Sequence, residues 1–236
     1  MKKAFVTGGS GALGQALVRK FVECGWDCAF SFRRGVKAAK ALTLECGAKA
    51  FEADLEDAQS VSLMAEKLES EFGSPDALVN NAGRSTAMPF ALLEASDWDD
   101  AMSGNLKSMF LATHALVRSM IRRGSGSIVN LGSIAGERLL GVPVTYATTK
   151  SAVRGFTLSL ARELARYSIR VNAVAPGMLE AGVSSLVPKL EKEEYLRYCL
   201  AGRTGRLEEV AEVVEFLAGE RSSFVNAQLI EVNGGF

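Results

Sequence analysis

The feature that most constrains this chain is a regular alternation of short apolar runs with longer segments of helical periodicity. The apolar runs have the length of buried strands and lie at residues 3–7, 28–32, 48–53, 77–80, 127–131, 169–175 and 228–232. The spacing of apolar residues between them predicts helices at residues 12–24, 36–46, 60–72, 96–122, 145–167 and 208–217. Such alternation is typical of a parallel sheet covered by helices on both faces. We therefore expect an α/β fold with a Rossmann-type doubly wound parallel sheet, in three layers (α/β/α), as a single domain over residues 1–236.

Two segments need a separate interpretation. Ser96, with Asp99 three residues later, is expected to cap the helix over 96–122. Residues 182–202 interrupt the alternation, and their mixture of apolar residues with lysines and glutamates predicts an amphipathic helical flap. We expect this flap to close on an apolar substrate, with a fixed helix that completes the core as the alternative.

Composition excludes several classes of function. The 236 residues are 48% hydrophobic, enough for one sizeable core. The 27 basic and 27 acidic residues cancel, which gives no reason to expect nucleic acid or an anionic membrane as a partner. No apolar run approaches the ~18 residues of a membrane span, and the N-terminus lacks the apolar core of a signal peptide.

The cysteines and the histidine narrow the chemistry further. Four cysteines without a CxxC pair are typical of a reduced, cytoplasmic protein. His114 is the only histidine in the chain, which excludes a His-rich metal site and disfavours a Ser-His-Asp hydrolase. We therefore expect no metal centre.

The first predicted strand runs into the glycine-rich segment Thr7-Gly8-Gly9-Ser10-Gly11-Ala12-Leu13-Gly14. Glycines let a backbone approach a ligand closely and reach dihedral angles barred to other residues. The next helix then offers free N–H groups and the positive end of its dipole to phosphates. The spacing Gly9-x-Gly11-x-x-Gly14 matches a general dinucleotide fingerprint. Glycine-rich turns also occur for geometry alone, but the position after the first strand favours nucleotide binding.

A tyrosine and a lysine, Tyr146 and Lys150, lie four residues apart in the helix predicted over 145–167. They share one helix face, so the ammonium group is expected to lower the tyrosine pKa below its usual value of about 10. The alternative is a solvated pair on the helix surface. Ser133 closes the fifth strand, where a hydroxyl faces the ligand crevice of a doubly wound sheet; its alternative role is a turn or helix cap.

Together these residues resemble the short-chain dehydrogenase/reductase family, from the first strand to the C-terminus. The markers are Thr7-Gly8 with Gly14, Asp54, Asn80-Asn81-Ala82-Gly83, Asn105, Ser133, Tyr146 with Lys150, and Pro176-Gly177. Each marker alone is weak, but seven in the family's order are specific. The pattern is most similar to 3-oxoacyl-(acyl-carrier-protein) reductases.

The resemblance implies an NAD(P)-dependent oxidoreductase that reduces a ketone to a secondary alcohol. Tyr146 would donate the proton, Ser133 would hydrogen-bond the substrate carbonyl oxygen, and Lys150 would lower the tyrosine pKa and hold the nicotinamide ribose. Asn105 would hold a water that links Lys150 to solvent. The residues implied to contact the cofactor are Gly8, Ser10, Gly11, Leu13, Gly14, Asp54, Leu55, Asn81, Ala82, Gly83, Tyr146, Lys150, Pro176, Gly177 and Leu179.

The sequence after the second strand indicates which form of the cofactor is used. An NAD-binding fold typically has an acidic residue there, which bonds the ribose 2′-hydroxyl. This chain has Arg33-Arg34 instead, and no Asp or Glu occurs between Asp27 and Glu45. Two arginines suit a 2′-phosphate, so we expect NADP, with NADPH preferred over NADH. The alternative is a solvated basic turn.

Some positions depart from the family's pattern. Ala12 stands where the family usually has glycine near the pyrophosphate, and Ala181 where a threonine often bonds the nicotinamide carboxamide. Residues 224–227 differ from the Thr-Gly that usually precedes the glutamine at Gln228. The first two departures bear on cofactor affinity, and none touches the reacting atoms.

The substrate is less constrained than the chemistry. A 3-oxoacyl group, free or bound to a carrier protein, is the first candidate, and another small alcohol, a sugar, a steroid or a polyketide is the alternative. Basic residues near the ends of two helices suit an acidic carrier or simply complement the helix dipoles: Arg118, Arg122, Arg123, Arg162 and Arg166. A non-catalytic nucleotide-binding protein is disfavoured because all four catalytic positions are present.

The resemblance also implies a homodimer or homotetramer that assembles through the two long helices and the C-terminal strand. Their outer faces are predicted to carry Met102, Met109, Phe156 and Leu160, more apolar side chains than a solvated helix needs.

Overall fold

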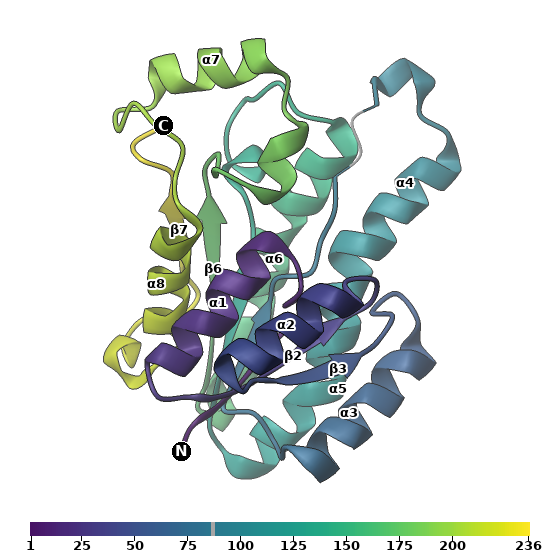
Figure 1. The fold of residues 1–236 in the computed structure, drawn as a ribbon, viewed down its shortest axis with the longest axis vertical. Helices are drawn as coiled ribbons and strands as arrows, with labels where there is room; N and C mark the ends of the chain where they lie inside the picture. The colour runs from purple at the N-terminus through teal and green to yellow at the C-terminus, as the bar shows by residue number, and fades with distance from the viewer. Residues whose placement is uncertain (86–87) are drawn as a thin grey trace.

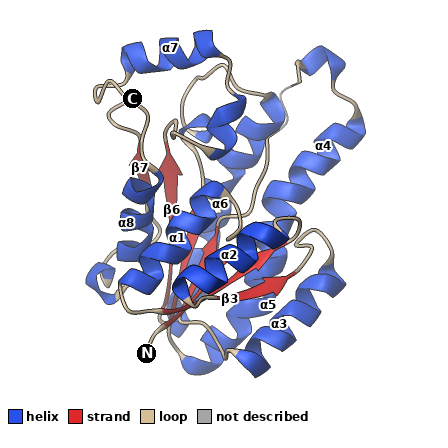
Figure 2. Cartoon of the chain, in the orientation of Figure 1, coloured by secondary structure: helices blue, strands red, loops and turns tan. Residues whose placement is uncertain are grey.

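The computed structural model describes residues 1–85 and 88–236 and confirms the α/β architecture. Within these residues seven parallel strands form one sheet in the order β3-β2-β1-β4-β5-β6-β7. The strands are β1 (Lys3–Val6), β2 (Asp27–Phe32), β3 (Lys49–Glu52), β4 (Ala77–Asn80), β5 (Gly126–Leu131), β6 (Ile169–Pro176) and β7 (Leu229–Val232). Figures 1 and 2 show the sheet between two layers of helices. The order reverses between β1 and β4, which is where a doubly wound sheet binds its ligand.

The sheet is buried on both faces because successive side chains of each strand point to opposite sides. Ala4 and Val6 of β1 join the core beneath α1 (Ala12–Glu23), α2 (Val36–Cys46) and α8 (Leu207–Ala218). Phe5, between them, joins the opposite core with side chains of α3 (Ala58–Glu71), α5 (Ser108–Arg123) and α6 (Val144–Leu164). Both layers therefore hold the strands from the two sides, and the carboxyl ends of the strands remain available for a ligand.

The helix expected over 96–122 differs from the prediction. It is divided into α4 (Ala95–Met102), a π-helical turn (Ser103–Lys107) and α5. Ser96 as its cap is wrong, because the helix begins at Ala95 and the backbone N–H of Glu94 donates to the Asp97 carboxylate at 2.9 Å. The π turn widens the helix where Asn105 lies, and such turns occur often at functional sites.

The segment predicted as a flap is helical. It consists of a 3-10 turn (Gly182–Leu186) and α7 (Lys189–Tyr198), which lies beyond the ends of β6 and β7 in Figure 1. Gly182 and Gly202, at the two ends, have positive φ angles of 82° and 63°, which favour glycine. None of the helices in the described part of the chain combines the length and the apolar composition that a membrane span requires.

Candidate active site

The turn between β1 and α1 is shaped by glycines that no other residue could replace. Gly8 has a φ of +67°, and a Cβ there would lie 3.0 Å from the Cα of Ala82. A Cβ on Gly14 would lie 2.2 Å from the carbonyl oxygen of Gly8. The first N–H groups of α1 point out of this turn, and Gly11, at the N-cap, has no side chain to occupy them. The turn therefore fits the pyrophosphate of a dinucleotide.

A cleft of about 450 Å³ runs from this turn along the carboxyl ends of the strands. Its wall includes residues at or just after the carboxyl ends of five strands: 31–35 at β2, 53–56 at β3, 81–84 at β4, 131–133 at β5 and 176–177 at β6. Every residue predicted to contact the cofactor lines this cleft, and so do Ser133, Tyr146 and Lys150. Asn105 is the one predicted site residue outside the wall, because its side chain is 3% exposed beneath the turn at Gly83.

Asn81 holds the end of β4 against the glycine turn. Its side-chain amide donates to the carbonyl oxygens of Thr7 at 2.9 Å and of Gly8 at 3.2 Å. The backbone N–H groups of Asn81 and Ala82 donate to the Thr7 hydroxyl at 2.9 and 3.0 Å. These bonds join the two strands at the reversal point of the sheet and fix the shape of the turn.

The adenosine end of the cleft contains the two predicted arginines in different environments. Arg33 Nη1 donates to Asp54 Oδ1 at 3.0 Å and to Glu56 Oε1 at 2.6 Å. Burial acts to lower the pKa of Arg33, but these bonds outweigh it and raise the pKa. Arg34 is exposed and also lines the cleft. The structure therefore places Arg34 ready for an anion, whereas Arg33 is already paired with two carboxylates.

At the other end, the residues of the catalytic pattern converge. Lys150 is almost fully buried, and its Nζ donates to the carbonyl oxygen of Leu131 at 2.9 Å. Its Nζ lies 5.8 Å from the centre of the Tyr146 ring. The Ser133 hydroxyl accepts a hydrogen bond from the N–H of Ala135 at 3.1 Å, so it also caps the short turn that follows β5. Ser133 therefore both caps this turn and lines the cleft, so the two roles considered for it are compatible.

The electrostatics of this group differ from the sequence-based expectation. Burial lowers the pKa of Lys150 to about 8, because the charged form loses its hydration. Burial also raises the pKa of Tyr146, and the neighbouring Ser133 hydroxyl opposes this only in part. The expectation that Lys150 lowers the tyrosine pKa is therefore wrong for the protein without cofactor. A positive charge brought into the cleft by a ligand would have to supply that effect.

Asn105 positions the backbone beside the lysine. Its Oδ1 accepts from the N–H of Arg84 at 2.9 Å, and its Nδ2 donates to the carbonyl oxygen of Ala101 at 3.0 Å. A Cβ on Gly83 would lie 2.8 Å from Asn105 Oδ1 and 3.7 Å from Lys150 Nζ. The Asn105 side chain is thus committed to the turn after β4, and the water-holding role inferred from the resemblance stays a prediction.

Sequence reasoning missed two charged residues in the cleft, Glu56 and Arg84. They pair with each other and follow β3 and β4 directly, so their positions after predicted strands were the available signal. Ala12, one of the departures from the family pattern, has its methyl close to the flap: a Cβ on Gly182 would lie 3.8 Å away. Ala181 lines the cleft beside it.

Comparison with known proteins agrees with this geometry. A family model described as enoyl-(acyl carrier protein) reductase matches residues 9–236. A 3-oxoacyl-(acyl-carrier-protein) reductase of Staphylococcus aureus is 36% identical over 99% of this chain and 97% of its own length. The corresponding reductase of Escherichia coli is 32% identical over 99% of this chain and 96% of its own length.

Solved structures give the same result. A gluconate 5-dehydrogenase from Burkholderia cenocepacia, in complex with NADP and tartrate, has a TM-score of 0.92 and 32% identity, and covers 99% of this chain and 94% of its own. The chain belongs to the short-chain dehydrogenase/reductase family. Within that class it is an NAD(P)-dependent oxidoreductase similar to the 3-oxoacyl-(acyl-carrier-protein) reductases.

Proposed function

We propose that this protein reduces a ketone to a secondary alcohol with NADPH, and that the ketone is a 3-oxoacyl thioester on an acyl carrier protein. The observation that carries the proposal is the convergence of Ser133, Tyr146 and buried Lys150 on one cleft with the glycine turn. The names of the relatives support the substrate class. A keto sugar acid is the second candidate substrate, supported by the name of the structural neighbour.

The cleft fits a dinucleotide along its length. The glycine turn and the start of α1 would hold the pyrophosphate, Asp54 and Leu55 the adenine, and Pro176, Gly177 and Leu179 the nicotinamide. Arg34 is the exposed guanidinium nearest in sequence to the end of β2 and would take the 2′-phosphate. When bound, the nicotinamide supplies the hydride chemistry.

The chain itself supplies position and protons. Ser133 holds the carbonyl oxygen of the substrate, and Tyr146 donates its proton to that oxygen as the negative charge develops. The raised pKa of Tyr146 keeps the phenol protonated before the reaction. Lys150, with a pKa of about 8, can take up and release a proton near neutral pH and resupplies the phenol, and Asn105 links it to solvent through a water.

The flap supports an apolar substrate. Val183 lines the cleft, and Leu186 and Leu190 are exposed on the same segment. Exposed leucines on an otherwise charged helix are expected where an acyl chain would bury them.

Consumption of NADPH by the purified protein tests the proposal. We expect oxidation of NADPH, followed at 340 nm as the loss of its ordinary absorbance, with a 3-oxoacyl pantetheine thioester. Turnover should be at least about tenfold lower with 5-ketogluconate, since only the thioester carries an apolar chain. No turnover with any ketone in a panel would contradict the enzymatic proposal, and turnover with the sugar acid alone would favour the second candidate.

We also propose that the protein is a cytoplasmic homodimer or homotetramer. Met109 is buried in the core, so it is wrong as an outer-face residue. Met102, Phe156 and Leu160 are partly exposed, and Phe156 and Leu160 also pack against the core. Exposed apolar side chains of the same helices support the proposal instead: Trp98, Phe110 and Leu158. Light scattering at micromolar concentration checks it, and a monodisperse monomer would exclude assembly through these helices.

A further inference from the structure

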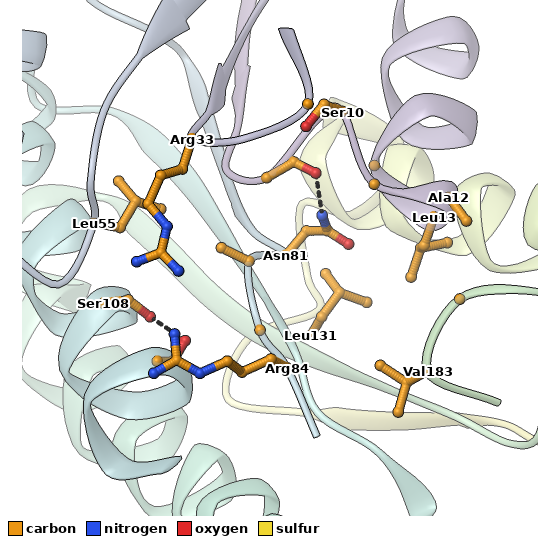
Figure 3. A pocket seen from close by; sticks show the side chains of 18 of the residues that line it. Ser10, Ala12, Leu13, Arg33, Leu55, Asn81, Arg84, Ser108, Leu131 and Val183 are labelled. Atoms are coloured by element: carbon orange, nitrogen blue, oxygen red, sulfur yellow. Dashed lines mark hydrogen bonds between the residues drawn. The ribbon is translucent and has the colours of Figure 1, made fainter. Parts of the chain in front are cut away.

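Four charged side chains form a continuous network at the adenosine end of the cleft. Arg33 binds Asp54 and Glu56 through one nitrogen, at 3.0 and 2.6 Å. Arg84 binds Glu56 from the other side with both terminal nitrogens, and its Nη2 lies 3.0 Å from Glu56 Oε2. Figure 3 shows the guanidinium groups of Arg33 and Arg84 converging near Leu55 and Ser108. Glu56 therefore lies between two guanidinium groups and is shared by them.

The position of Arg84 is built into the backbone around it. Its Nη2 also donates to the carbonyl oxygen of Asp100 at 3.0 Å, and its N–H donates to Asn105 Oδ1 at 2.9 Å. A Cβ on Gly104 would lie 2.8 Å from the central carbon of the guanidinium. A side chain at position 104 would therefore require the guanidinium to shift, and with glycine there Arg84 packs closely over the π turn.

The network keeps Glu56 ionised. Partial burial acts to raise the pKa of its carboxyl, but the hydrogen bonds from Arg84 and Arg33 outweigh burial and lower the pKa. A phosphate bound by the remaining N–H groups of Arg33 would lie well within the Debye length of about 8 Å from this carboxylate. Glu56 would therefore repel the phosphate, and Arg84 would offset that repulsion.

We propose that Glu56 and Arg84 together set the preference between NADPH and NADH. Glu56 weakens binding of the 2′-phosphate because its negative charge neutralises Arg33. Arg84 offsets this effect because its positive charge neutralises Glu56. Without Arg84, Arg33 would face two carboxylates alone, and its charge would no longer be available to a ligand. This inference rests on the proposed use of the cleft for a nicotinamide dinucleotide, and it assigns a specificity-determining pair outside the turn after β2 that carries Arg33 and Arg34.

The test is a double-mutant cycle with the full-length protein, in which the Kd of NADPH and of NADH are measured by fluorescence titration. Glu56→Gln should tighten NADPH binding by about threefold to tenfold and leave NADH nearly unchanged. Arg84→Met should weaken NADPH binding by a similar factor and also leave NADH nearly unchanged. In the double variant the NADPH affinity should match that of Glu56→Gln alone, because Arg84 acts through Glu56 and its loss has no further effect once the repelling charge is gone.

Two controls separate this electrostatic role from packing. Glu45→Gln removes an exposed carboxylate that pairs with Arg19 at 2.7 Å outside the cleft, and both dissociation constants should stay unchanged. The effects of Glu56→Gln and Arg84→Met should also shrink at 1 M salt, where the Debye length is about 3 Å.

Three results would overturn the inference. They are equal changes in the Kd of NADPH and of NADH, additive effects of the two substitutions in the double variant, or changes in Kd that stay the same at 1 M salt. If Glu56→Gln or Arg84→Met does not fold, Glu56→Asp replaces it, because the shorter side chain keeps the negative charge but moves it away from the arginines. The binding of 2′,5′-ADP is then compared with the binding of 5′-AMP. Glu56→Gln either tightens or weakens NADPH binding, and this direction can be measured even if the unmutated protein prefers NADH. The failure of the NADPH proposal can therefore be distinguished from the failure of this inference.

Discussion

The two ends of the cleft are built in different ways. At the adenosine and phosphate end, glycines pack against backbone and the strands are joined by hydrogen bonds from Asn81 and Thr7. At the substrate end, part of the wall is formed by residues 181–184, which belong to a segment outside the sheet. Leucines of the same segment are exposed, and Leu190 is 76% exposed. From this contrast we expect the cofactor end to be formed before any ligand arrives and the substrate end to be completed by its ligand.

The flap itself repeats this contrast on a smaller scale. Tyr195 is buried, donates its hydroxyl hydrogen to the carbonyl oxygen of Asn233 at 3.1 Å and stacks on Phe236 with ring centres 4.6 Å apart. Leu186 and Leu190, near the other end of the segment, are exposed. The segment is therefore anchored at the end of α7, and the part nearer Gly182 is the part that we expect to move.

The largest effect should come from the residue between the two ends. Tyr146→Phe removes the proton donor, and we expect at least about a 10²-fold loss of turnover. The Kd of the cofactor should stay within about threefold, since no predicted phosphate or adenine contact changes. Steady-state kinetics and a cofactor titration on the same preparation check both statements. Near-normal turnover in this variant would contradict the mechanism.

Burial of Lys150 should reduce the stability of the folded protein. Its pKa falls from 10.5 to about 8 on folding. Below pH 8 the charge is buried in the folded state, and the penalty is about 3 kcal/mol. Lys150→Met should therefore raise the free energy of unfolding at pH 7 by about 2 kcal/mol, after the lost bond to Leu131 is counted.

The stability of the unmutated protein should depend on pH because of this shift in the Lys150 pKa. Between pH 8 and 10.5 the folded protein has released the Lys150 proton while the unfolded chain still holds it, so the stability of the unmutated protein rises with pH. The difference in the free energy of unfolding between Lys150→Met and the unmutated protein, measured by urea unfolding, should therefore decrease between pH 8 and 10.5. A variant that is less stable than the unmutated protein at pH 7 would show that the buried ammonium does not carry this penalty.

A smaller effect is expected at the phosphate end. Arg34→Ala should weaken NADPH binding by about tenfold and hardly affect NADH, because Arg34 is the exposed guanidinium at the cleft. Arg33→Ala should reduce the preference less, since Arg33 is held by Asp54 and Glu56. The ratio of the two dissociation constants in each variant is the measurement, and a larger loss at Arg33 would reverse this assignment.

The fold was predictable from sequence because burial on both faces of a parallel sheet leaves continuous apolar runs such as Ala77–Val79. The division of the helix at Ser103–Lys107 was not, because a single π turn of five residues is too short to leave a distinct periodicity in the apolar pattern. What fixes it is the contact of Asn105 with the turn after β4, which only the folded chain shows.

The candidate site was predictable to the same extent. Residues that follow strands were placed correctly at the cleft, because all parallel strands end at one edge of the sheet. The pairing of Glu56 with Arg84 was not predictable, since β2 and β1 lie between the strands that precede them. The direction of the Tyr146 pKa was also missed, because a motif gives the spacing of two side chains but not their burial.

Amide hydrogen exchange tests the central contrast most directly. It should be measured in the free protein, with NADPH, and with NADPH and a 3-oxoacyl thioester. We predict that β1 and β4 exchange slowly in all three states, while residues 182–190 exchange fast in the free protein and gain protection when both ligands are bound. Slow exchange of residues 182–190 in the free protein, unchanged by ligands, would contradict the account and show that the flap is a fixed part of the core.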